Sequence, residues 1–98
     1  MLKPRYTRFF TTLCNRIRLE IVFSLRKQPL NVTQITRVLG YDQSTISNSL
    51  RTLRNCGFVD VRPNGKERVY YLNDKTIEPL LKLVDQHTEE CCKHLVYE

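Results

Sequence analysis

The sequence predicts a mostly α-helical domain that carries a single two-stranded β-hairpin. Three observations point to this fold class. Apolar residues recur at helical spacing through most of the chain, and an Asn-Gly pair separates two short runs rich in β-branched and aromatic residues. The 98 residues are enough for one hydrophobic core and too few for two. We therefore expect residues 1–98 to form one domain.

The first two helices are expected on either side of Asn15. Residues 5–13 place aromatic side chains at helical spacing, which indicates a first helix within residues 1–14. The second helix begins after Asn15, a favourable N-cap residue, and stops before Pro29. Its apolar side is formed by Ile17, Ile21, Val22 and Leu25.

Two further helices are expected around a tight turn at Gly40, which suits a left-handed helix end. The shorter one spans residues 32–39. Asp42 caps the longer one, which runs from Gln43 to about Asn55 and ends at Gly57. The side chains expected to face the core are Ile35, Val38 and Leu39 from the shorter helix and Ile46, Leu50 and Leu53 from the longer one.

A hairpin and a last helix complete the chain. The strands are expected at residues 58–62 and 68–72, with a turn at residues 63–66 between them. Asp74 is expected to cap a helix that begins at Lys75 and continues toward residue 98. Its apolar side is formed by Ile77, Leu80, Leu81, Val84, Thr88, Cys91 and Leu95.

Two short helices joined by a tight turn and followed by a two-stranded ribbon make a winged helix-turn-helix. Residues 31–56 then form the helix-turn-helix and residues 58–72 the wing. The helices within residues 1–14 and 75–98 flank this unit. Their aromatic and aliphatic faces would be poorly covered in a monomer, which predicts a homodimer.

The charge distribution indicates a polyanionic partner for the first half of the chain. The formal charge is +6, and residues 1–54 hold ten basic and two acidic side chains, a net charge of +8. The longest apolar run has four residues, which excludes a membrane-spanning helix, and the amino terminus leads into no apolar signal core. We expect a cytoplasmic protein.

The helix at residues 43–55 has the composition of a DNA-reading helix. Its exposed side carries short or forked hydrogen-bonding side chains, which bind base edges and phosphates, and no acid after Asp42. The wing adds basic side chains around a flexible tip. A merely polar, solvated surface is the alternative for both. The expected DNA-binding residues are Gln43, Ser44, Thr45, Ser47, Asn48, Arg51 and Arg54 in the helix, and Arg62, Asn64, Lys66 and Arg68 in the wing.

The run from Leu39 to Val59 resembles the helix-turn-helix signature of the ArsR/SmtB-like repressors. The segment from Asn64 to Leu72 resembles their wing, and residues 15–21 match the start of their second helix. The similarity covers roughly residues 14–85. It implies a homodimer paired through its first and last helices, one recognition helix in each major groove of double-stranded DNA, and repression released by a ligand.

The metal-site motifs of that family are largely missing. Residues 33–39, where its arsenic site would lie, contain no cysteine, and Asp85-Gln86-His87 matches only half of its zinc-type motif. The residues left as candidates for zinc or a trivalent metalloid are His87, Cys91, Cys92 and His94. Packing of Cys91 at a dimer interface and a disulfide are the alternatives. In a dimer, Cys14 of one chain would approach Cys91 or Cys92 of the other, either as a third ligand or as an interchain bridge.

Cys14 and Cys56 are interpreted as core residues, with Cys56 packed beneath the wing. The sequence contains no Ser, His and acid cluster, no paired carboxylates on expected loops and no glycine-rich phosphate loop, so we expect no enzyme activity. A winged-helix protein-interaction module is the alternative from a different class. It would need an apolar recognition helix, whereas this one is polar and basic.

Overall fold

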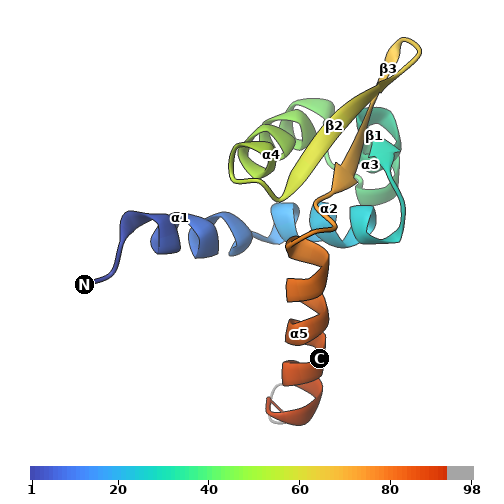
Figure 1. Ribbon diagram of the computed structural model, residues 1–98. Helices are drawn as coiled ribbons and strands as arrows, with labels where there is room; N and C mark the ends of the chain where they lie inside the picture. The colour runs from blue at the N-terminus through green and yellow to red at the C-terminus, as the bar shows by residue number, and fades with distance from the viewer. Residues whose placement is uncertain (93–98) are drawn as a thin grey trace.

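The computed structural model describes residues 1–92, which fold into five helices and a small antiparallel sheet (Figure 1). The elements in chain order are α1 (Pro4–Leu13), α2 (Arg16–Lys27), β1 (Leu30–Asn31), α3 (Val32–Leu39), α4 (Gln43–Asn55), β2 (Val59–Asn64), β3 (Glu67–Leu72) and α5 (Ile77–Glu90). This is the mostly helical fold with a hairpin that the sequence predicts.

The expected helix ends are confirmed at three positions. The Asn15 side chain accepts a hydrogen bond from the backbone N–H of Arg18 at 3.0 Å, and the Asp42 side chain accepts one from Thr45 at 2.7 Å. Gly40 ends α3 with φ +83°, a conformation that side chains with a Cβ rarely adopt. These caps separate α2, α3 and α4 and so allow the three helices to pack around one core.

The core lies between α2, α3, α4 and the base of the hairpin. Its fully buried side chains include Ile21, Ile35, Ile46, Leu53 and Phe58. One expectation about the core is wrong. Val38, which was expected to face the core, is 65% exposed, because no described element covers that side of α3. Val84 of α5 is 42% exposed, which agrees with the expectation that the apolar side of the last helix is poorly covered in a single chain.

The sheet has one strand more than the sequence predicts. β1 pairs with β3, with Leu30 opposite Tyr70, and β3 pairs with β2 along the hairpin. The hairpin strands are also longer than expected. Pro63 and Asn64 belong to β2, and only Gly65 and Lys66 lie between the strands. The wing is therefore anchored to the start of α3 through β1.

The last helix begins two residues later than expected and is not capped by Asp74. Instead, the Asn73 side chain accepts hydrogen bonds from the backbone N–H groups of Lys75 and Thr76, which form a turn ahead of the helix. α5 ends at Glu90. The helix was expected to continue, but Cys91 and Cys92 are described and are not helical. Residues 93–98, including Leu95, lie outside the described residues.

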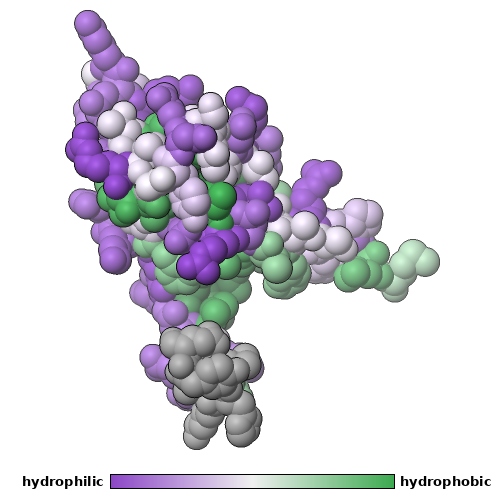
Figure 2. Space-filling model, turned by 180° about the vertical axis from the view of Figure 1, so that it is seen from behind, coloured by the Kyte–Doolittle hydropathy of each residue, from purple (hydrophilic) through white to green (hydrophobic). Residues whose placement is uncertain are grey.

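α1 and α5 project from the body in different directions (Figure 1). Arg26 of α2 connects α2 to α5, because its guanidinium donates to Glu78 at 3.0 Å and to Asp85 at 2.8 Å. The two carboxylates raise the pKa of Arg26, Asp85 more than Glu78. Apolar surface is visible on both arms in Figure 2. The large apolar side chains exposed on α1 and α5 are Tyr6, Phe10, Leu83 and Val84. No helix within residues 1–92 has the length and apolar character needed to cross a membrane.

Candidate nucleic-acid interface

Helix α4, which is expected to read DNA, has one side buried in the core and the opposite side exposed to solvent. Ile46, Leu50 and Leu53 are at most 1% exposed and fix the helix against the core. The residues on the opposite side at helical spacing are Ser44, Asn48, Arg51 and Asn55, and all four are exposed. We call these four residues the outward row. They present hydroxyl, amide and guanidinium groups to solvent.

The amino-terminal end of α4 is held by two contacts. Hydrogen bonds from the hydroxyl and backbone N–H of Thr45 lower the pKa of Asp42, so this cap stays ionised at neutral pH. The Tyr41 hydroxyl donates to Glu20 of α2 at 2.6 Å, which raises the pKa of Tyr41. The turn between α3 and α4 is thereby tied to α2.

The other expected residues of α4 lie beside the outward row. Gln43 and Arg54 are exposed, whereas Thr45 and Ser47 are half-buried. Arg54 approaches Asp60 of β2 with 3.6 Å between Nε and Oδ1. Ser47 and Arg54 lie on the side of α4 that faces the wing, since both line a cleft there together with Arg68 and Tyr70 of β3.

All four expected wing residues, Arg62, Asn64, Lys66 and Arg68, are exposed. The Arg62 guanidinium lies 5.2 Å from the centre of the Tyr71 ring, which orients it along the hairpin. The single acid of the wing tip, Glu67, accepts a hydrogen bond from the Asn31 side chain at 2.9 Å. Asn31 also accepts from the backbone N–H of Gln34 at 2.7 Å, so one side chain both caps α3 and contacts the wing.

Tyr70 is a candidate site residue that the sequence interpretation missed. It lines the cleft with Arg51 and Arg68, between the recognition helix and the wing. The available signal was its position in the strand, because Tyr70 and Arg68 are two residues apart and therefore lie on the same face of β3.

The comparisons with known proteins agree with this geometry. The sequence model of the family described as "Bacterial regulatory protein, arsR family" matches residues 15–61. The cadmium resistance transcriptional regulatory protein CadC of Listeria innocua is 31% identical over 88 residues, which cover 89% of this chain and 74% of CadC. The chain belongs to the arsR family.

Further relatives of this arsR-family chain extend the comparison. The HTH-type transcriptional regulator NmtR of Mycobacterium tuberculosis is 40% identical over 72 residues, which cover 74% of this chain. The match covers only 60% of NmtR. A solution structure of Mb0332 from Mycobacterium bovis superposes with a TM-score of 0.82 at 26% identity, covering 96% of this chain and 87% of that one. It is described as a homodimeric winged helix-turn-helix DNA-binding domain.

The four cysteines of this arsR-family chain are free thiols within the chain. The expectation that Cys14 is a core residue is wrong, because Cys14 follows the last residue of α1 and is exposed, although the preceding Leu13 packs against the core. Cys56 is half-buried and packs against the core, as expected, and its side chain contacts α1. Its Sγ lies 3.2 Å from Oγ1 of Thr12.

The described residues of one chain do not fit a metal centre. No group of three or more His, Cys, Asp and Glu side chains comes together within residues 1–92. Cys91 and Cys92 follow the last residue of α5, and His94 lies outside the described residues. Asp85, the acid of the half-matched motif, is paired with Arg26.

Proposed function

We propose that this arsR-family protein is a homodimeric regulator of transcription that binds double-stranded DNA sequence-specifically, most simply as a repressor. It has no enzymatic role in this proposal and acts inside the cell, where the DNA is. The observation that carries the proposal is the outward row of α4, an exposed line of Ser44, Asn48, Arg51 and Asn55 that takes no part in the core.

The outward row has the chemistry needed to read base pairs. Amide side chains pair with adenine in the major groove and guanidinium groups pair with guanine, each through two hydrogen bonds. We assign Asn48 and Arg51 to base edges. Gln43, Ser44 and Ser47 are assigned to base or phosphate positions, and Lys66 and Arg68 of the wing to the sugar-phosphate backbone.

The exposed apolar side chains of α1 and α5 support the dimeric part of the proposal, in which two chains pair through these helices. Phe10 is 63% exposed and Leu83 is 63% exposed, although both are large apolar side chains. Burial of these arms in a symmetric interface would remove that apolar surface from water. The homodimeric description of Mb0332, whose fold covers nearly the whole of this chain, points the same way.

The polar character of α4 argues against a protein-interaction module. Among the described residues, the large hydrophobic side chains that are exposed lie at the amino terminus and on α1, α2, α3 and α5, and none lies on α4. A helix that docks on another protein would present apolar anchors in its outward row.

The test is a selection of binding sites from random duplex DNA, followed by mobility-shift titrations on the selected sequence and on a scrambled one. We expect an enriched, inverted-repeat sequence with half-site centres one helical turn apart, about 34–36 Å. Binding to the scrambled duplex should be at least about a thousandfold weaker. Equal affinity for the two duplexes would contradict sequence-specific regulation.

A metal- or metalloid-responsive function is the second candidate. The observation that favours it is the free state of Cys14, Cys91 and Cys92, of which Cys14 is exposed at the junction of α1 and α2 and Cys91 is exposed at the carboxyl-terminal end of α5. Since one chain does not form a centre within its described residues, a site would have to combine thiolates from two chains. Metal analysis of the purified dimer before and after Cys91→Ser and Cys92→Ser tests this. A wild-type dimer that binds neither Zn²⁺ nor arsenite contradicts it.

A further inference from the structure

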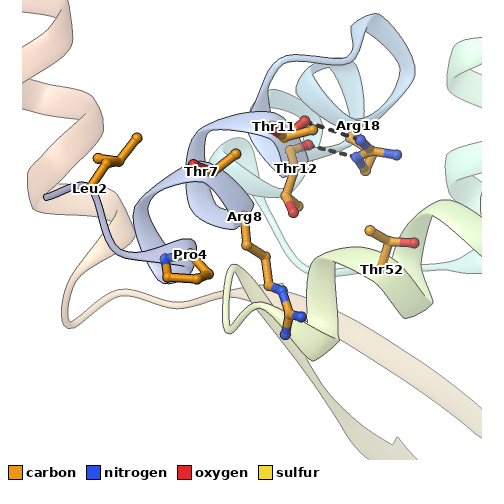
Figure 3. A pocket seen from close by; sticks show the side chains of 8 residues that line it. All are labelled: Leu2, Pro4, Thr7, Arg8, Thr11, Thr12, Arg18 and Thr52. Atoms are coloured by element: carbon orange, nitrogen blue, oxygen red, sulfur yellow. Dashed lines mark hydrogen bonds between the residues drawn. The ribbon is translucent and has the colours of Figure 1, made fainter.

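A basic groove separates α1 from the carboxyl-terminal half of α4. It consists of two adjoining hollows, and Arg8 lines both of them. The first also contains Thr7 and Thr11 of α1, Arg18 of α2 and Thr52 of α4 (Figure 3), and the second also contains Arg5 of α1 and Asn55 of α4. None of the described residues that line the two hollows is acidic. The groove therefore suits an anion.

The groove lies on a side of α1 that dimerisation leaves open. Phe9 and Leu13 pack against the core, and Phe10 is exposed on another side of the helix. Residues two apart on an α-helix lie about 200° apart around its axis, so Arg8 and Phe10 point in nearly opposite directions. A dimer that buries Tyr6 and Phe10 keeps Arg8 in contact with solvent beside α4.

The groove is continuous with the outward row of α4. Thr52 lines it, and the Thr52 hydroxyl donates to the backbone carbonyl of Asn48 one turn earlier, at 3.2 Å. Asn55 belongs both to the outward row and to the second hollow. The cleft toward the wing flanks the outward row on one side, and the basic groove flanks it on the other.

The major groove of B-DNA is bounded by two phosphate backbones, one on each side of an inserted helix. The wing residues lie toward one of them. We propose that Arg8 and Arg18 bind the phosphates of the other backbone, at the edge of the major groove away from the wing. This inference rests on the proposed DNA-binding function, and it assigns a contact outside the helix-turn-helix and the wing.

Arg18 is held in place for this contact. Its Nε donates to the backbone carbonyl of Thr12 at 2.6 Å and its Nη2 to that of Thr11 at 3.3 Å (Figure 3). A guanidinium has five N–H donors, so these two contacts leave donors for a phosphate. The same contacts tie α2 to α1, which makes Arg18 unsuitable for the first test. Arg8 is exposed and is the residue to replace.

The experiment compares Arg8→Gln with Lys82→Gln. Both remove one positive charge from an exposed helix position, but Lys82 is on α5, which projects away from α4 (Figure 1). The logarithm of affinity is plotted against the logarithm of salt concentration on one selected duplex. Because a dimer carries two copies of Arg8, we expect Arg8→Gln to reduce the magnitude of the slope by about 1.8, which is about 0.9 for each protomer, and to weaken binding at low salt about three- to tenfold for each lost contact. Lys82→Gln should leave the slope unchanged, and Arg8→Lys should restore it.

Duplexes with single neutral methylphosphonate linkages locate the contact. Wild-type protein should lose affinity at positions on both edges of the major groove. Arg8→Gln should become insensitive only at the linkage that Arg8 contacts, on the edge away from the wing, and Lys66→Ala only at a linkage on the other edge. Melting temperatures of the variants, measured alongside, should match the wild type.

Three outcomes would overturn the inference. The first is an unchanged salt slope in Arg8→Gln, and the second is equal sensitivity of wild type and Arg8→Gln at every neutral linkage. The third is loss of dimerisation in Arg8→Gln while the pattern of sensitive linkages stays that of the wild type. Binding of inorganic phosphate to wild type but not to Arg8→Gln, with DNA binding unaltered, would assign the groove to a small anion instead. Wild-type protein that binds no duplex would contradict the proposed function itself.

Discussion

At the scale of single residues, Arg51 and Asn48 differ from their neighbours because their side chains do not contribute to holding the fold together. Both are exposed on the outward row, and within the described residues neither side chain makes a hydrogen bond, since Asn48 accepts from Thr52 through its backbone carbonyl. Asp42, by contrast, holds the helix end, and Arg54 approaches Asp60. Replacing a residue of the first kind tests DNA recognition, and replacing one of the second kind tests folding.

We expect Arg51→Ala to cost about 1–3 kcal/mol of binding free energy on the selected site and to relax base preference at one position. The reason is loss of a two-hydrogen-bond contact to guanine with no loss of core packing. Mobility-shift titrations on the selected site and its single-base variants measure this. An equal loss on random DNA would show that Arg51 contacts phosphate only.

The lowered pKa of Asp42 predicts that the stability of the fold decreases at acidic pH. Its pKa is lowered in the folded protein from the ordinary value of 3.8, so its contribution is complete above that value and is lost as the pH falls toward the folded pKa. In Asp42→Asn the amide oxygen can still cap α4, but the side chain does not titrate. Melting temperatures of wild type and Asp42→Asn should therefore converge or cross between about pH 4 and pH 2. Parallel curves over this range would mean that Asp42 contributes nothing through its charge.

At the scale of elements, sequence patterns predicted the helices and strands that are specified by residues within the element itself. α2 and α4 have caps and apolar residues at helical spacing within themselves, and the structure confirms both. β1 was missed because a strand of two residues has no pattern of its own, and it exists through pairing with β3 some forty residues later. Val38 and Cys14 were expected in the core but are exposed, for the same reason, since burial depends on which distant element covers a side chain.

The candidate site was likewise predicted where one element forms it and missed where two elements come together. The row on α4 follows from helical spacing, and the basic wing follows from the hairpin signal. The basic groove beside α1 was not visible, because Arg8 and Thr52 come together only through the packing of α1 against the core. Tyr70 was missed because the cleft it lines is formed by two elements.

The wing should act as a backbone-binding element. Its base is fixed by β1 and by the contact of Asn31 with Glu67, while Lys66 lies in the two-residue turn at its tip. We expect Lys66→Ala and Arg68→Ala to weaken binding to all sequences alike and to reduce the salt slope by about one for each lost phosphate contact. Slopes equal to that of the wild type in both variants would remove the wing from the interface.

At the scale of the whole molecule, the two arms give the chain an extended outline with principal extents of 44, 35 and 24 Å. A chain of this size gains little from arms that remain in water, because each exposes apolar side chains. The ion pairs of Arg26 with Glu78 and Asp85 fix the direction of α5 relative to α2. In a dimer this direction sets the distance between the two recognition helices.

Phe10→Ser should weaken dimerisation, because Phe10 is 63% exposed in the single chain and lies on the apolar side of α1. Phe23→Ser is the matched control, since Phe23 is 42% exposed but lies on α2. Sedimentation equilibrium should show a dissociation constant raised about tenfold or more for Phe10→Ser only. A wild-type protein that remains monomeric at micromolar concentration would contradict the dimeric arrangement.

The separation of the two sides of α4 has a consequence for how such proteins diverge. The side chains that pack α4 against the core are Ile46, Leu50 and Leu53, and none of them belongs to the outward row, so the outward row can change without loss of core packing. A lineage can exchange Ser44, Asn48, Arg51 and Asn55 and acquire a new operator while every packing contact persists. Grafting four side chains from a relative should then transfer that relative's target preference onto this scaffold.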